Sequence, residues 1–149
     1  MREILFRGKS ADDGEWVEGS LVITTIEPAD GDPIKHYHIE DMTIGVFPNE
    51  HQSGLTATVV PETVGQYTGL TDKNGKKIFE GDIVVCRQEI NGNWLDYCVE
   101  IGFVEMKHGA FGLHRKQGYY RPFKDWLEDY EYEVIGNIHD NPDLLQKEE

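Results

Sequence analysis

Histidine side chains form the first group in this sequence whose spacing could do chemistry. His36 and His38 lie on one face of a predicted strand, and Glu40 continues that face. A metal site needs three or four such ligands to converge. The remaining histidines are distant in the sequence, namely His51, His108, His114 and His139. We therefore expect surface or half-buried histidines and no metal site.

The two cysteines are the second group. Cys86 and Cys98 are too few for a disulfide scaffold, do not form a Cys-x-x-Cys motif, and lack a third ligand at zinc spacing. If Asn91-Gly92-Asn93 is a three-residue hairpin loop, Ile90 faces Trp94 and Cys86 lies opposite Cys98. The sequence thus predicts two small buried thiols on neighbouring strands. It leaves open whether they pair on oxidation.

Two short motifs begin like known binding loops but lack the residues that binding needs. Gly8-Lys9-Ser10 ends like a phosphate-binding loop, but Glu3 stands where the first glycine is required and no helix follows. Asp72-Lys73-Asn74-Gly75 starts like a calcium loop, but its glycine comes too early and lysines follow where oxygen ligands are needed. We predict a tight turn there, because Asn and Gly tolerate positive φ and Asp accepts hydrogen bonds from the following backbone.

Serine and carboxylate side chains do not form a catalytic arrangement either. No Gly-x-Ser-x-Gly elbow surrounds any of the three serines, Ser10, Ser20 and Ser53. Three carboxylates share the polar side of a predicted helix, where a solvated face is commoner than acid–base chemistry: Asp125, Glu128 and Asp129.

A tyrosine pair could bind a base or a peptide. Tyr119-Tyr120-Arg121 has the composition for stacking, but we expect one of the adjacent tyrosines to point into the core. The sequence therefore predicts no catalytic, cofactor-binding or metal-binding residues, and no cofactor.

Short strands must position these side chains. Sixteen glycines and repeated Asn-Gly and Asp-Gly steps indicate many turns. The segment from Val60 to Val85 predicts a β meander, with turns at 72–75 and 80–82. A hairpin is predicted from residues 4–6 and 16–26. Further strands are predicted over residues 35–39, 42–47, 56–60, 82–90, 94–104, 103–106, 110–114 and 132–138.

One segment has helical spacing. Its apolar residues recur at i, i+3, i+4 and i+7 within Phe123 to Tyr130, namely Phe123, Trp126, Leu127 and Tyr130. With nine or ten short strands and one or two short helical segments, we expect a mainly β protein that closes into a barrel or packs as a sandwich. A chain of 149 residues suits one domain, or two small ones.

Acidic residues dominate the charge. The chain carries 14 basic and 28 acidic residues, a net charge of −14, and residues 10–62 hold one basic and eleven acidic residues, or −10. This does not suit direct binding to a phosphate backbone. Acidity keeps a small protein soluble, although a surface that imitates nucleic acid stays an alternative. With no apolar run near ~20 residues and a charged N-terminus, we expect a cytoplasmic protein without a membrane partner.

Three blocks of this sequence resemble the YopX family of bacteriophage and prophage proteins. They are Met1–Lys9, Gln66–Val84 and Glu133–Leu145. The resemblance implies a β-rich N-terminal part, taken as residues 1–62, followed by an SH3-type barrel over residues 63–149. It also implies a phage or prophage origin, a bacterial host cell and self-association, and it brings no catalytic residues.

Three functional hypotheses follow. The first is a non-enzymatic module that binds a host or phage protein. The second is an acidic inhibitor of a DNA-binding protein, which predicts one contiguous stripe of carboxylates. The third is an enzyme or nucleotide binder whose site assembles from distant residues, for example His38, Asp82 and Tyr120.

Overall fold

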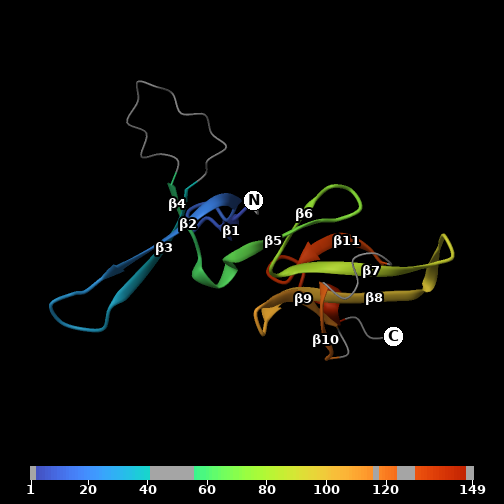
Figure 1. Ribbon diagram of the computed structural model, residues 1–149. Coiled ribbons are helices and arrows are strands. Elements are labelled where there is room, and N and C mark those ends of the chain that lie inside the picture. Colours follow the sequence, from blue (N-terminus) through green and yellow to red (C-terminus); the bar gives the residue numbers. More distant parts are fainter. Residues whose placement is uncertain (1–2, 41–55, 116–117, 124–129, 147–149) are drawn as a thin grey trace, which may run out of the picture. The chain divides into compact units, whose positions relative to one another are not determined.

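The protein consists of two units built almost wholly of antiparallel strands. The computed structural model describes residues 3–40, 56–115, 118–123 and 130–146 (Figure 1). Unit 1 spans Met1–Gln66 and unit 2 spans Tyr67–Glu149, whereas the sequence placed the division between residues 62 and 63. The prediction of a mainly β fold is confirmed.

Unit 1 is a small antiparallel sheet in the order β4-β3-β2-β1. A first hairpin is confirmed, because β1 and β2 pair antiparallel from Phe6 opposite Gly19 to Lys9 opposite Trp16. Its first strand covers residues 6–9 and not the predicted 4–6. The elements of unit 1 are β1 (Phe6–Lys9), β2 (Trp16–Ile26), β3 (Ile34–Glu40), β4 (Thr56–Thr58) and the short 3-10 helix η2 (Pro61–Thr63).

Unit 1 is held together where β1 meets the start of β2. The Arg7 guanidinium lies 4.7 Å from the centre of the Trp16 ring, and the Lys9 ammonium lies 5.5 Å from it. Val59 is buried against Gly8 of β1, and Ile39 is buried on β3, where it pairs with Leu21 of β2. The apolar core of unit 1 therefore lies near β1, and not along the outer part of β2.

Unit 2 contains a five-stranded antiparallel sheet in the order β10-β9-β8-β7-β11. The strands and turns of the predicted meander are present, with turns at residues 72–75 and 80–81, and β5 pairs antiparallel with β6. The predicted meander itself is not confirmed, because β6 and β7 belong to different sheets among the described strands. The elements are β5 (Gly65–Thr71), which crosses the unit boundary, β6 (Lys77–Phe79), β7 (Asp82–Ile90), β8 (Asn93–Lys107), β9 (Ala110–Arg115), β10 (Tyr120–Pro122), β11 (Tyr130–Asn137) and α1 (Asp143–Gln146).

One face of the unit 2 sheet forms its apolar core. Alternate residues of neighbouring strands point to the same face, and their buried side chains gather there: Ile78, Val84, Cys86, Val104, Leu113, Phe123 and Tyr132. The Phe123 and Tyr132 rings meet edge to face, with centres 5.2 Å apart. Burial of these side chains is the main stabilising term for unit 2.

The sheet of unit 2 is open. Among the described residues, β10 and β11 are its edge strands, and no sheet closes into a barrel. The SH3-type barrel implied by the family resemblance is therefore not confirmed.

The predicted strand register, which placed Cys86 opposite Cys98, is wrong. Asn91 and Gly92 have φ of 53° and 79° and form a two-residue hairpin turn, so Ile90 pairs with Asn93 and not with Trp94. The register then shifts, and Cys86 lies opposite Glu100. The error has two causes. Asn93 was assigned to the loop, although Asn-Gly alone suffices for this turn, and counting back from the turn did not allow for the register shift between Cys86 and Gln88.

Two predicted elements fall partly or wholly outside the described residues. The predicted strand at 42–47 lies entirely outside them, as do residues 124–129 of the predicted helix. Tyr130, predicted to end that helix, is instead the first residue of β11.

We predict that Gly75→Val destabilises the protein by about 1–2 kcal/mol, because Gly75 has a φ of +79° and a β-branched residue is strained there. No atom lies within 4 Å of an added Cβ, so a clash does not contribute. The free energy of unfolding from denaturant titration measures the effect, with the neighbouring Lys76→Val as the control. Equal stability of the two variants would contradict the prediction.

Candidate functional site

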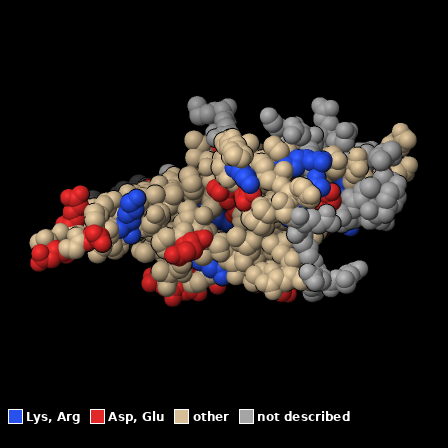
Figure 2. Space-filling model, turned by 90° about the horizontal axis from the view of Figure 1, so that it is seen from below, with Lys and Arg blue, Asp and Glu red and all other residues tan. Residues whose placement is uncertain are grey.

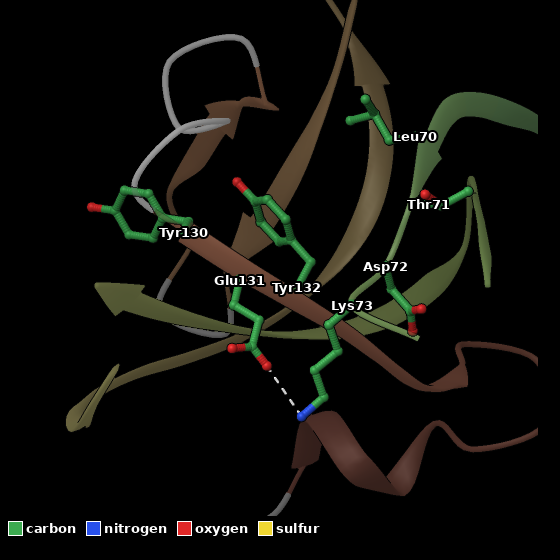
Figure 3. Close-up of a pocket in the computed structure, with 7 residues that line it drawn as sticks. All are labelled: Leu70, Thr71, Asp72, Lys73, Tyr130, Glu131 and Tyr132. Carbon is green, nitrogen blue, oxygen red and sulfur yellow. Dashed lines mark ion pairs between the residues drawn. The ribbon is translucent and has the colours of Figure 1, made fainter. Parts of the chain in front are cut away.

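A pocket of about 310 Å³ lies in unit 2 (Figure 3). Its size is at the lower end of the range of small-ligand sites, roughly 300–1,000 Å³. The lining comes from the end of β5, the turn that follows and the start of β11: Leu70, Thr71, Asp72, Lys73, Tyr130, Glu131 and Tyr132. Because neighbouring residues of β11 point to opposite faces, this lining places the pocket along the edge of that strand.

Asp72 fixes the turn against β11. Its Oδ1 accepts hydrogen bonds from the backbone N–H groups of Asn74 and Lys76, each at 2.9 Å. Its Oδ2 accepts one from the Val134 N–H at 3.0 Å, and the Lys73 N–H donates to the Tyr132 carbonyl at 2.9 Å. The side chain thus takes the place of a neighbouring strand at this edge of the sheet.

The hydrogen bonds also determine the ionisation of Asp72. Burial acts to raise the pKa of this carboxyl, but the N–H groups of Val134, Lys76 and Asn74 together lower it below its ordinary value. Asp72 is therefore ionised at neutral pH. All three of its hydrogen bonds to the backbone stabilise the charged form.

Lys73 forms the rim of the pocket. Its ammonium lies 3.1 Å from a Glu131 carboxylate oxygen and 3.3 Å from one of Glu133, and Figure 3 shows the Lys73 and Glu131 side chains reaching toward one another. These carboxylates, Glu131 first, raise the pKa of Lys73. A lysine held as a cation is not a nucleophile.

The wall of the pocket is apolar and aromatic. Leu70 and Tyr130 are half-buried and pack against the core, and Tyr132 belongs to it. Asp72 is hydrogen-bonded to the backbone and Lys73 is paired with carboxylates, so both side chains help to shape the site. The arrangement suits recognition of an apolar or aromatic group beside charged ones.

The Cys86 thiol and the phenol of Tyr132, which lines the pocket, are poor reactants. Burial, aided by the Glu100 charge, raises the pKa of the Cys86 thiol to about 12. Burial likewise raises the pKa of Tyr132. Cys86 is a free, buried thiol, which confirms its predicted burial. At neutral pH it is protonated and does not act as a nucleophile.

The histidines of the predicted face lie in unit 1. The His36 and His38 rings stack with centres 6.2 Å apart, and His38 Nδ1 lies 3.4 Å from the Thr58 hydroxyl. In unit 2, His114 Nδ1 lies 2.9 Å from a Glu105 carboxylate oxygen. Among the described residues, no three His, Cys, Asp or Glu side chains converge as metal ligands would.

The three residues of the enzyme or nucleotide-binder hypothesis, His38, Asp82 and Tyr120, do not belong to one unit. His38 belongs to unit 1, whereas Asp82 and Tyr120 belong to unit 2. Asp82 is buried and accepts a hydrogen bond from the Phe79 N–H at 2.8 Å. Tyr120 donates its hydroxyl to backbone carbonyls of the β8–β9 hairpin. Both side chains thus have structural roles.

The remaining candidates are similarly placed. Tyr120 is half-buried and packs toward Gly112, while Tyr119 is 68% exposed. The prediction that one tyrosine of the pair points into the core is not confirmed, because Tyr120 shares a sheet face with His114 and not with the core residue Leu113. Ser10 is buried and Ser20 lies on β2. Four candidates, Ser53, Asp125, Glu128 and Asp129, lie outside the described residues.

Sequence reasoning missed the pocket. It identified the Asp72–Gly75 turn but assigned no role to Leu70, Tyr130 or Glu131. A signal existed in the alternation Tyr-Glu-Tyr-Glu over residues 130–133, which marks a strand with one aromatic and one acidic face.

Comparisons with known proteins give one family match and one similar solved structure. A family model described as YopX protein matches residues 5–146. The crystal structure of protein EF1440 from Enterococcus faecalis is 24% identical, with a TM-score of 0.48 over 97% of this chain and 99% of that chain. No curated protein matches the sequence. No helix among the described residues is long and apolar enough to cross a membrane.

We predict that Asp72→Asn destabilises the protein by about 2 kcal/mol at neutral pH, because one amide cannot replace three hydrogen bonds to a charged acceptor. The pKa of Asp72 is lower in the fold than in the unfolded chain, so its stabilisation is present above about pH 3.9 and is lost as the pH falls through the folded pKa. Thermal melts should therefore differ at pH 7 and converge in acid.

Asp143→Asn is the control for this prediction, because this carboxylate is exposed in the first turn of the short helix α1. A constant difference between the melts of Asp72→Asn and the parent from neutral to acid pH would contradict the role of the ionised carboxylate.

Proposed function

This chain belongs to the YopX protein family, and we propose that it is a non-enzymatic protein-binding module. The observation that carries the proposal is the pocket beside β11. In this pocket an apolar wall lies next to the ion pair between Lys73 and Glu131. Such a site recognises a side chain and has no group poised for proton transfer or nucleophilic attack.

The pocket would receive an apolar or aromatic side chain from an extended segment of the partner. Leu70 and the two tyrosine rings offer the contact area, and Lys73 and Glu131 offer charges at the rim. Aromatic anchors in small pockets commonly dominate the affinity of protein interfaces. In this proposal the partner is a host or phage protein met in the cytoplasm of a bacterial cell, without direct contact to nucleic acid or membrane.

The SH3-type barrel belongs to the same proposal. The strands β7 to β10 form a meander, and β11 then pairs with β7, which gives the order β10-β9-β8-β7-β11. Closure of such a twisted sheet into a barrel would further require its edge strands, β10 and β11, to meet. We therefore take unit 2 as a partly open barrel whose edge carries the pocket.

The acidic-inhibitor alternative has less support. It requires the carboxylates to form one stripe, whereas Figure 2 shows acidic side chains in several separate groups on the face in view. Separate groups steer a basic partner but do not imitate the regular spacing of phosphates along a duplex.

A peptide-display selection tests the pocket. Peptides selected from a random library on the full chain should share an apolar or aromatic anchor. Their affinity, measured by fluorescence anisotropy, should fall by about tenfold or more for Thr71→Arg. Thr71 is exposed and lines the pocket, so the long cationic side chain blocks the site without disturbing the core.

The control is Thr56→Arg, the same change at an exposed position of β4 in unit 1. Selected peptides that bind the parent and both variants equally would overturn the pocket as the binding site. A selection that returns no anchored peptide would overturn the proposed function.

A further inference from the structure

The outer half of β2 has an open edge. β1 pairs with β2 only from Trp16 to Gly19. Beyond that point, Ser20–Ile26 pairs with β3 on its other side, from Ser20 opposite Glu40 to Ile26 opposite Ile34. Among the described strands none pairs with the remaining edge of Ser20–Ile26. We call residues 20–40, which form this part of the hairpin, the arm; Figure 1 shows it extending beyond β1.

This edge lacks the features that protect edge strands. Natural proteins commonly place a lysine, a proline or a bulge there. The segment Ser-Leu-Val-Ile-Thr-Thr-Ile contains no charge and no proline, and its register with β3 is continuous. Its β-branched residues favour an extended backbone. The arm therefore presents an uncharged strand whose backbone groups are oriented for a further strand.

Apolar side chains are exposed along both faces of the arm. Ile23 is 48% exposed on one face, and Ile26 and Ile34, which lie opposite each other, are 53% and 52% exposed on the other. An isolated two-stranded ribbon is marginally stable in water. An added strand would pair with the backbone groups of the open edge, and its side chains would cover part of the apolar side chains on both faces.

The charges around this edge indicate what kind of strand fits. Exposed Glu18 precedes the uncharged segment and exposed Glu27 follows it, with Asp30 and Asp32 in the hairpin loop. Residues 18–40 carry five acidic residues and one basic one, a net charge of −4. Figure 2 shows acidic side chains at the end of the arm. An incoming segment therefore meets negative charge on both sides.

A second copy of the chain fits this edge poorly. Antiparallel pairing centred on Ile23 would place Glu18 of one copy opposite Pro28 of the other, next to Glu27, and would repeat this at the other end. Like charges brought together destabilise such a contact, and each copy carries a net charge of −14.

We propose that Ser20–Ile26 binds, by strand addition, an extended uncharged segment of another protein that carries Lys or Arg on both sides. Backbone hydrogen bonds and apolar contacts hold the segment, and the flanking acidic groups select its charge. This surface lies in unit 1 and the pocket lies in unit 2, so each proposal can fail without the other.

A labelled peptide tests the proposal on the full chain. The probe is an alternating Thr-Val peptide as long as Ser20–Ile26 with lysines at both ends, and its partner probe has glutamates instead. Anisotropy should show that the lysine-flanked peptide binds about tenfold or more tightly than the glutamate-flanked one. Its affinity should fall as salt is raised, because the flanking charges are exposed.

Thr24→Lys tests the edge itself. A lysine in the middle of the strand should reduce binding of the lysine-flanked peptide by about tenfold or more, whereas Thr56→Lys on β4 should leave it unchanged. Thr25→Lys serves the same purpose if circular dichroism shows that the first variant does not fold. Equal binding by these variants, or no binding by the parent, would overturn the proposal.

Light scattering tests whether a second copy of the chain binds at this edge. The parent chain and Thr24→Lys should have the same mass in solution. A parent that is dimeric and becomes monomeric on Thr24→Lys would show that a second copy occupies this edge, and would overturn the proposal of a different partner.

Discussion

The turn beside the pocket of unit 2 depends on one carboxylate, that of Asp72, and on the backbone N–H groups that donate to its two oxygens. One oxygen closes the turn locally through Asn74 and Lys76, and the other reaches Val134 on a strand 62 residues away. The same side chain therefore shapes a turn and joins it to β11. This joint holds the turn that carries Lys73 against the strand that carries Tyr130, and both residues line the pocket.

The two units present recognition surfaces of different kinds. In unit 2 the sheet buries a packed core on one face, and the pocket is a hollow at its edge. In unit 1 the core stops near β1, so the outer part of β2 and β3 extends with apolar side chains in water. A pocket selects a side chain, whereas an open strand edge selects an extended backbone with suitable flanking charges. Neither surface needs a reactive group.

Local chemistry explains which predictions were right. The Asp72–Gly75 turn was predictable because Asp, Asn and Gly each bring a conformational preference that acts within a few residues. The strands around it were predictable from alternation and from β-branched residues. The register of β7 and β8 was mispredicted for two reasons. One residue more or less in the Asn91-Gly92 turn shifts every later pair of residues. The register shift between Cys86 and Gln88 leaves no local trace in the sequence.

The sequence by itself determined the mainly β character, the tight turns, the acidic arm and the absence of charge between Ser20 and Ile26. All of these depend on residues close together in the chain. Only the tertiary structure decided that Val134 would complete the bonding of Asp72, that Tyr130 would line a pocket, and that no described strand would cover the edge of β2. These features depend on contacts between distant segments, whose free energy comes from packing and burial that no local pattern specifies.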